Sequence, residues 1–348
     1  MQDLTSFYQN QINKHQEVLE KVKHQLFASS MVRLAIFCLA AIALYFLFGN
    51  TKWVLAIVLV TIVAFLFLVS RHSNLQRKRD KLKALVTINK TEIKVLKRDF
   101  YRLPEGNEFK DPLHHFSQDI DLFGRGSFYQ YLNRTALQQG SDTLADIFKA
   151  NSINAIFKKQ EAIKELSKLP EWRQDFSATA SLTKTETATK KIVEWLQNYV
   201  PFVPRLMRWL PLAFSVASIT VFALYFFDFL LESLLIIWVL LGLGITSIYS
   251  KKIQKLGGFA SRMQSTFRQY NELLLQIEEY DFKSELLTNK KKVILSEGKK
   301  TSEIIKDFSK LLNSLDKNLN VFYLIFANGF FLRTLTHCFN VENWIAKH

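Results

Sequence analysis

The sequence predicts a mainly α-helical membrane protein with two transmembrane helical hairpins and a cytoplasmic helical bundle. Three observations predict this fold class. Four long apolar stretches occur in two close pairs, the polar segments repeat apolar residues at helical spacing, and convincing strand-like alternation never extends beyond a few residues. The chain has 348 residues and a formal net charge of +15, which a membrane surface explains better than nucleic acid does, because the basic residues gather beside the apolar stretches.

The apolar stretches form two pairs. Residues 34–48 and 53–69 are separated only by Gly-Asn-Thr-Lys, and residues 209–227 and 233–249 form the second pair. A helix needs roughly 20 apolar residues to cross a bilayer, and each stretch comes close to this length. A buried helix of a soluble protein could explain one stretch alone, but two pairs with tight connections favour two membrane hairpins. The first stretch follows a long polar, helix-patterned segment, so it is not expected to be a cleavable signal peptide.

Basic residues predict the orientation of these hairpins. They flank both pairs on the side away from the short connections, and the positive-inside rule then places the N-terminus, the middle segment and the C-terminal segment in the cytoplasm. The flanking residues are Arg33, Arg71, Arg77, Lys78, Arg79, Lys81 and Lys83 for the first pair, and Arg205, Arg208, Lys251, Lys252 and Lys255 for the second. Cys38 and Cys338 lack a spacing typical of metal or redox chemistry.

Heptad seams occur on both sides of the first hairpin. Because a hairpin returns the chain to the side it left, we expect the two seams to pair antiparallel and to prolong the hairpin into the cytoplasm. On these seams His15 is expected to pack and Asn89 to fix the register. The seam residues are Tyr8, Ile12, His15, Leu19, Val22 and Leu26 in the first segment, and Leu75, Leu82, Val86, Ile93, Leu96 and Phe100 in the second.

The sequence divides into four predicted domains, and two features of the chain help to define them. A proline- and glycine-containing stretch at residues 103–115 is expected to end the second seam helix. A final apolar run at residues 321–339 contains Asn328, Arg333 and His337, which favour a helix buried in protein over a fifth span. The predicted domains are 1–103 with the first hairpin, 104–204 as a cytoplasmic helical region, 205–250 with the second hairpin, and 251–348 as long C-terminal helices.

Residues 116–148 are the most distinctive stretch, and their pattern predicts turns and helix caps. Asp119 and Asp121 are expected to accept backbone amides, Gly124 and Gly126 to adopt torsions that other residues avoid, and Ser127 to cap a helix from residue 128. The remaining expectations are a buried face of Phe128, Tyr131 and Leu132, a turn at residues 133–135, a reversal at Gly140, and a second helix capped by Ser141 or Asp142 with Leu144, Ile147 and Phe148 facing the core.

Chemical sites are weakly indicated in this stretch. His114, His115, Asp119 and Asp121 lie close in sequence but in an irregular segment, which disfavours a metal site. Asp119 and Asp121 are two residues apart, so in extended backbone they face opposite sides and make a poor acid-base pair. The order of glycines, lysine and serine or threonine that forms a phosphate loop does not occur. The sequence therefore predicts no enzyme activity, no metal, no small-molecule substrate and no cofactor for this chain.

The stretch resembles the start of the helical core and lever domain of MutS-type DNA mismatch-repair ATPases, and the paired spans make the likeness closest to membrane-anchored MutS-like proteins of bacteria. A second match lies at residues 159–166, which resemble a helix that follows in that family. The signature residues, taken as structural, are Asp119, Asp121, Leu122, Phe123, Gly124, Ser127, Leu132, Asn133, Arg134, Thr135, Gly140 and Leu144.

The resemblance implies a non-catalytic module in the bacterial inner membrane that couples an ATPase domain, absent from this chain, to the bilayer. ATP and magnesium would belong to that domain, which could follow in a longer protein or act as a separate partner, and a homodimer is expected. No Phe-x-Glu mismatch-reading motif occurs, and the second hairpin stands where the family carries its DNA clamp. DNA association through the basic helices is therefore weakly supported, and the alternative is a membrane scaffold or interaction protein without a DNA role.

Overall fold

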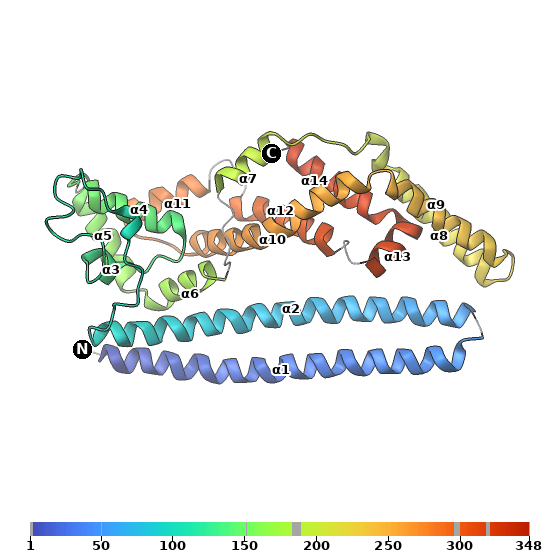
Figure 1. Ribbon diagram of the computed structural model, residues 1–348, viewed down its shortest axis with the longest axis horizontal. Coiled ribbons are helices and arrows are strands. Elements are labelled where there is room, and N and C mark those ends of the chain that lie inside the picture. Colours follow the sequence, from blue (N-terminus) through green and yellow to red (C-terminus); the bar gives the residue numbers. More distant parts are fainter. Residues whose placement is uncertain are drawn as a thin grey trace. The chain divides into compact units, whose positions relative to one another are not determined.

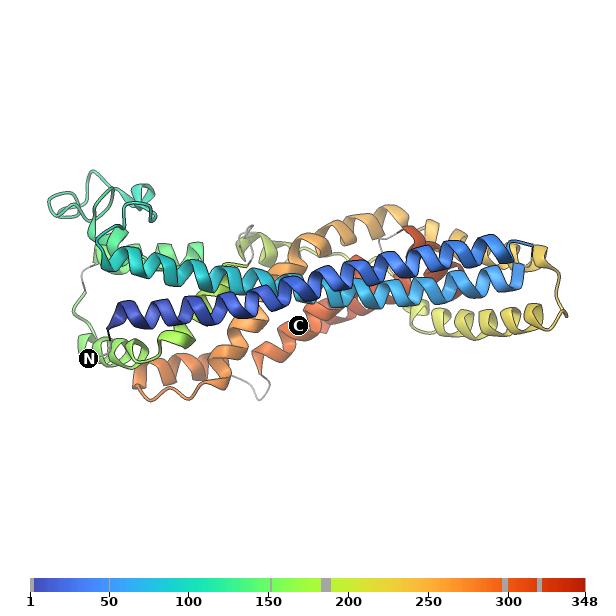
Figure 2. The same ribbon diagram turned by 90° about the horizontal axis from the view of Figure 1, so that it is seen from below.

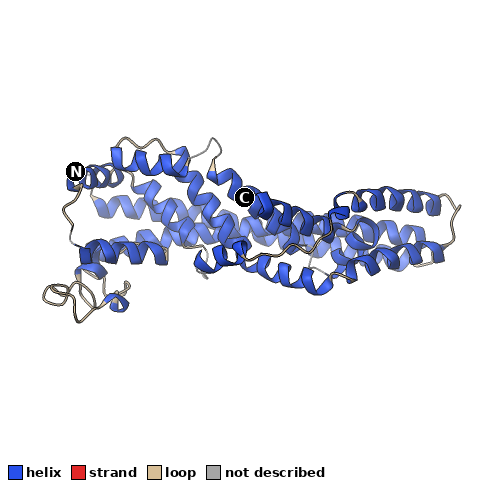
Figure 3. Ribbon diagram, turned by 90° about the horizontal axis from the view of Figure 1, so that it is seen from above, coloured by secondary structure: helices blue, strands red, loops and turns tan. Residues whose placement is uncertain are grey.

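Helices are the only regular secondary structure in the part of the chain that the structure describes (Figure 3), which confirms the mainly α fold class. The computed structural model describes residues 3–49, 51–150, 152–182, 189–295, 300–317 and 321–347. The chain divides into two compact units, and two of the dividing points fall inside helices, after Lys52 and after Leu274. The first unit comprises Met1–Gly49, Trp53–Lys184 and Leu275–Leu295; the second comprises Asn50–Lys52, Thr185–Leu274 and Ser296–His348.

Two long helices dominate the first unit. α1 (Leu4–Leu47) and α2 (Thr51–Leu96) lie side by side and run antiparallel (Figure 1 and Figure 2). Each carries a polar half and an apolar half without a break, so the expected spans and seams belong to the same two helices. Asp3 starts α1, because its Oδ1 accepts a hydrogen bond from the Thr5 amide at 3.1 Å. By length and composition, α1 and α2 can each cross a membrane.

The polar halves of α1 and α2 meet along most of the expected seams, although Leu96 is 42% exposed and Phe100 lies beyond the end of α2. Leu19, Val22 and Leu26 of α1 form a buried cluster with Leu82 of α2. The apolar halves expose their side chains instead, with Phe37 and other large residues uncovered in both helices. Exposed aliphatic and aromatic residues on continuous helices are typical of surfaces that face lipid.

His15 on the α1 seam is expected to make the folded state less stable as the pH falls. Burial, assisted by the neighbouring Lys14, lowers the pKa of His15 below its ordinary value, against the opposing effect of Glu171 and Asp175. The folded state therefore disfavours the charged imidazolium. The free energy of unfolding starts to decrease as the pH falls below the unfolded-state pKa of about 6.5, and the decrease is complete below the folded-state pKa. Denaturant unfolding between pH 7.5 and 5 should show a smaller loss of stability in His15→Gln than in the wild type. Equal losses in both proteins would contradict the prediction.

Short helices complete the first unit beside the polar ends of α1 and α2. A small core formed by residues 109–148 contains Leu122, Phe123, Tyr129 and Ala145, with Phe109 and Phe148 packed against it. The helices are η1 (Asn107–Phe109), α3 (Phe128–Leu132), α4 (Gln138–Ala150), α5 (Ile156–Ser167), α6 (Pro170–Ala180) and α11 (Glu285–Ile294).

The second unit is built around a larger aromatic and aliphatic core. Phe308 is fully buried between Phe267, at a ring distance of 4.8 Å, and Trp344, at 3.9 Å. Its helices are α7 (Thr189–Gln197), η2 (Arg205–Arg208), α8 (Leu210–Phe226), α9 (Glu232–Ser247), α10 (Ser250–Glu279), α12 (Thr301–Lys317), α13 (Val321–Phe331) and α14 (Arg333–Lys347).

The second apolar pair forms α8 and α9, which have 17 and 16 residues. They pack against each other, and the Trp238 indole donates a hydrogen bond to Ser218 Oγ at 2.8 Å. Among the described residues, two helices are long and apolar enough to span a membrane, or three if α9 and α10, bent by 69°, form one span. A prediction of four spans requires helices of roughly 20 residues, and α8 and α9 are shorter than that. The second transmembrane hairpin therefore stays a prediction.

The last apolar run divides at Leu332, where φ is +47°, into α13 and α14. Asn328 is fully buried, and its Oδ1 accepts a hydrogen bond from the Thr334 amide at 3.0 Å across the break. α13 packs against α8 and α9. The run thus forms two helices, not one. The helix that contains Asn328 packs against protein, as the polar residues of the run predict.

Candidate functional site

The glycine turn before α3 has the geometry that the sequence predicts. Gly124 has φ +113° and Gly126 has φ +77°, values that disfavour L side chains. Ser127 is buried, and its Oγ accepts a hydrogen bond from the Gln130 amide at 3.1 Å, which confirms the helix cap. Leu122 and Phe123 are buried just before this turn.

The acidic residues of the signature do not make the expected contacts. Asp119 and Asp121 are exposed, and no hydrogen bond among the described residues uses either carboxylate. Asp121 itself has φ +47°, a conformation that aspartate tolerates better than most residues. The prediction that both acids accept backbone amides is wrong, because the local turns are closed by backbone hydrogen bonds such as Leu122 N to Ser117 O at 2.9 Å.

The buried face of α3 also differs from the prediction. Phe128 and Leu132 are 55% and 41% exposed, whereas Tyr129 and Gln130 are buried. Gln130 Oε1 accepts from the Gly126 amide at 2.7 Å, and its Nε2 donates to the Leu103 carbonyl at 2.7 Å. A helix of five residues is too short for an apolar periodicity to decide its orientation, so this polar residue becomes its inner anchor.

The turn after α3 is confirmed at Asn133, whose Oδ1 accepts from the Thr135 amide at 2.9 Å and from Thr135 Oγ1 at 2.6 Å. The start of the next helix is corrected. α4 begins at Gln138, so Gly140, Ser141 and Asp142 lie inside it and none of them caps it. Gly140 packs against Thr135, where an added Cβ would meet the Thr135 side chain at 3.3 Å, so its small size explains its position. Within α4, Leu144 packs on the core and Ile147 is exposed.

The histidine pair has a structural explanation. The His114 ring bridges the Ser117 amide at 3.3 Å and the Lys149 carbonyl at 3.2 Å, and it stacks on His115 at 4.8 Å. Within the described ranges, no three His, Cys, Asp or Glu residues gather in a way that could hold a metal ion.

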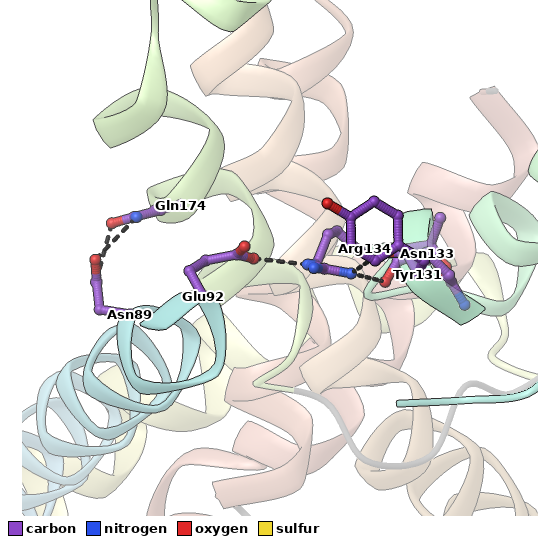
Figure 4. Close-up of polar contacts among 7 residues, drawn as sticks. Asn89, Glu92, Tyr131, Asn133, Arg134 and Gln174 are labelled. Carbon is purple, nitrogen blue, oxygen red and sulfur yellow. Dashed lines mark hydrogen bonds and ion pairs between the residues drawn. The ribbon is translucent and has the colours of Figure 1, made fainter. Parts of the chain in front are cut away.

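Arg134 makes polar contacts both within its own turn and with α2 (Figure 4). Its Nε donates to Glu92 Oε1 on α2 at 2.6 Å, and its Nη1 donates to the carbonyls of Tyr131 and Asn133, both at 2.9 Å. Both charged side chains are largely shielded, at 33% and 22% exposure. Arg134 therefore ties the turn after α3 to the polar end of α2.

A second tie joins α2 to α6 through Asn89 and Gln174, which exchange two amide hydrogen bonds of 3.0 Å each (Figure 4). Asn89 is fully buried and also donates to the Leu85 carbonyl at 2.8 Å. Asn89 was expected to fix the register of the paired seams, but its partner lies on a third helix. Lys81 and Asp175 add a 2.8 Å ion pair between the same two helices.

The contacts of α6 were not predicted, although the helix lies in the region that the sequence indicates to be helical. Glu171 accepts a hydrogen bond from Gln11 Nε2 on α1 at 2.7 Å, and the Trp172 ring lies 5.7 Å from that of Phe282. Asp175 also accepts from Gln276 Nε2 at 2.8 Å. Successive residues of α6 thus contact different segments of the first unit. Pro170 at the helix start followed by glutamate, tryptophan, arginine, glutamine and aspartate was the available signal.

A cleft of about 380 Å³ lies where α1, α2, α3 and α6 meet. Tyr8, Glu92, Leu96, Tyr131, Arg134 and Arg173 are among its lining residues. Burial, and after it the charge of Glu92, raises the pKa of Tyr8, while Arg173 and Arg134 act against this shift. Cationic, anionic, phenolic and aliphatic groups therefore converge on one concave surface, which is the best candidate for a functional site in the first unit.

The Arg134–Glu92 pair is expected to couple the signature turn to α2 measurably. Removal of one partner leaves the other shielded from water without a counter-charge, so Arg134→Ala or Glu92→Ala should each cost about 1–3 kcal/mol of unfolding free energy. In a double-mutant cycle, the double variant should cost clearly less than the sum of the single variants. Lys158→Ala and Glu285→Ala, which remove an exposed ion pair of the same unit, form the matched control cycle with little coupling. Additivity in the Arg134–Glu92 cycle would contradict the prediction.

Comparisons with known proteins identify no relative for this arrangement. No protein-family model matches the chain, and neither the curated proteins nor the solved structures contain a significant match. The likeness of residues 121–144 to MutS-type proteins therefore stays a prediction from the sequence.

Proposed function

We propose that this chain is a non-catalytic, membrane-embedded coupling module that passes movement between a cytoplasmic helical assembly and the bilayer. One observation carries the proposal: α1 and α2 are each one helix from the apolar half to the polar half, and short helices attach to the polar half of α2. At 1.5 Å per residue, the 44 residues of α1 span roughly 66 Å, about twice a bilayer core. A tilt at one end of such a rod therefore moves the other end.

The contacts on α2 support this role. Arg134–Glu92, Gln174–Asn89 and Asp175–Lys81 attach the short helices to α2 between residues 81 and 92. These ties are charged or amide pairs between defined partners, so they favour one angle between the short helices and α2.

The finer assignment follows the sequence. Both apolar pairs would lie in the bacterial inner membrane with the polar segments in the cytoplasm, and the likeness to MutS-type lever domains suggests that an ATPase domain supplies the movement. ATP and magnesium would act in that domain, and the lever arrangement suggests a homodimer. The alternative function is a membrane scaffold, which needs the same anchorage but no transmission of movement.

Topology is tested by single cysteines introduced into a Cys38→Ser, Cys338→Ser background. An impermeant maleimide added to intact spheroplasts should label Gly49→Cys and Phe229→Cys, which lie at the short connections, and should label Lys168→Cys only after lysis. Labelling of Lys168→Cys in intact spheroplasts would overturn the membrane arrangement.

Coupling is tested by hydrogen exchange of the full chain in nanodiscs of two bilayer thicknesses. A change in thickness alters the tilt of a membrane helix, so amide protection at residues 128–150 should differ between the two bilayers. The difference should shrink in Arg134→Ala and persist in Lys158→Ala. Identical protection in both bilayers would favour the scaffold over the coupling module.

A further inference from the structure

We propose that the cleft between α1, α2, α3 and α6 binds a small amphipathic anion, with a carboxylate or phosphate group beside Arg173 and a short apolar group against α2. The cleft lies entirely within the first unit, so the site is complete there. The proposal concerns a bound ligand, not a substrate, and it stands independently of the membrane coupling proposed above.

The charge of the cleft favours an anion. Three charged side chains line it, Arg134, Arg173 and Glu92, which leave one positive charge in excess. Glu92 is engaged by Arg134 Nε at 2.6 Å. Within the described part of the chain, the Arg173 guanidinium makes no hydrogen bond or ion pair, and its side chain is exposed. A free guanidinium offers paired N–H donors that match a carboxylate or a phosphate.

The other polar groups extend this anion site. Tyr8 lies in the field of both arginines, which act on its pKa together with Glu92, so all four groups are close enough to interact. Its phenol can donate to an anion near neutral pH, because a tyrosine is protonated there even at its ordinary pKa of about 10. Arg134 uses Nε and Nη1 in its contacts, and none of the hydrogen bonds of the described residues uses its Nη2.

The apolar part of the cleft explains why the ligand should be amphipathic. Ile88, Val95, Leu96 and Leu132 line the same space as the arginines. Leu96 and Leu132 are 42% and 41% exposed, although both belong to the polar part of the unit. A ligand whose apolar group covers these two leucines would bind more tightly, because burial of apolar surface is favourable. Inorganic phosphate and acetate lack such a group and would not gain this contribution.

The size of the cleft limits the ligand. About 380 Å³ lies near the lower end of the range typical of small-molecule sites, roughly 300–1,000 Å³. A helix or a nucleic acid duplex does not fit such a space, so a compact molecule is favoured over a folded partner.

The experiment uses the full chain in nanodiscs and a fluorinated probe, 4-(4-fluorophenyl)butyrate, observed by ¹⁹F NMR. The expected result is saturable binding with one site per chain, weakened at least about tenfold by Arg173→Gln, because a hydrogen-bonded charged contact contributes roughly 1.5–3 kcal/mol. Arg173→Lys should bind with intermediate affinity, since it keeps the charge and loses the planar fork. Arg102→Gln removes an exposed arginine outside the cleft and should bind like the wild type.

Two further comparisons complete the test. The amine of the same length, 4-(4-fluorophenyl)butylamine, should show no saturable binding, whereas the corresponding alkyl phosphate should compete with the carboxylate. Partition of the probe into lipid is not saturable and is equal in all variants, so it cancels in the comparison. Equal affinity in wild type and Arg173→Gln, or saturable binding of the amine, would overturn the proposal. Neither result would bear on the topology or exchange experiments that test the coupling function.

Discussion

Alanine at position 242 is expected to destabilise the second unit by about 1–3 kcal/mol, because it forces α9 away from α13. A Cβ on Gly242 would lie 2.6 Å from the backbone carbonyl oxygens of both Asn328 and Gly329. These atoms belong to a helix backbone and cannot move aside as a flexible side chain could. Small residues let two helix backbones approach closely, so an added methyl group at such a contact separates the helices.

Gly244→Ala is the matched control, since it lies two residues away on the same helix and a Cβ there meets nothing within 4 Å. It should be neutral or slightly stabilising, because alanine favours a helix over glycine by up to about 1 kcal/mol. Unfolding in a detergent titration can be followed by the fluorescence of Trp238, which stacks on Phe214 with ring centroids 4.9 Å apart. Equal stability of Gly242→Ala and Gly244→Ala would show that α9 and α13 do not pack through Gly242.

Substitution of Glu342 by glutamine is the second change with a large expected effect. The Glu342 side chain is buried, and its carboxylate accepts hydrogen bonds from the Phe202 amide at 2.8 Å, the Val203 amide at 3.1 Å and the Tyr199 hydroxyl at 2.9 Å. These contacts hold the connection between α7 and α8 onto α14. Burial, with Glu342 beside it, raises the pKa of Tyr199, so this hydroxyl remains a donor at all physiological pH values.

The expected cost of Glu342→Gln is about 2–4 kcal/mol, because an amide has one acceptor oxygen where the carboxylate has two, and its NH₂ group would face a donor. Denaturant unfolding measures this cost, and hydrogen exchange should show lost protection at the Phe202 and Val203 amides. Glu285→Gln removes a charge from an exposed ion pair and should change stability by less than about 1 kcal/mol. A Glu342→Gln variant with wild-type stability and protection would contradict this account of the connection.

The long helices were predictable because their signals are local and repeat many times. Ile12, Leu19, Val22 and Leu26 recur at steps of three, four and seven residues, and all four are buried. A seam with this many members outweighs any single residue that departs from it. The cap at Ser127 was predictable for a related reason, since its contact spans only three residues of sequence.

Short helices were the places where the same reasoning was wrong. In α3, five residues give a little over one turn, and the apolar Phe128 lies outside while the polar Gln130 lies inside. The carbonyl of Leu103, which Gln130 contacts, comes from another segment, so no periodicity within α3 could indicate it.

The sequence by itself determined the helical character of this protein, the two helices long and apolar enough for a membrane, the paired seams and the turns at Gly124 and Asn133. Each of these depends on interactions within a few residues or on a repeated pattern. Only the tertiary structure decided that Asn89 pairs with Gln174, that Arg134 engages Glu92, and that a cleft with a free Arg173 lies between four helices. Such contacts join residues from 42 to 85 positions apart, and their partners depend on how whole helices pack, which no local rule encodes.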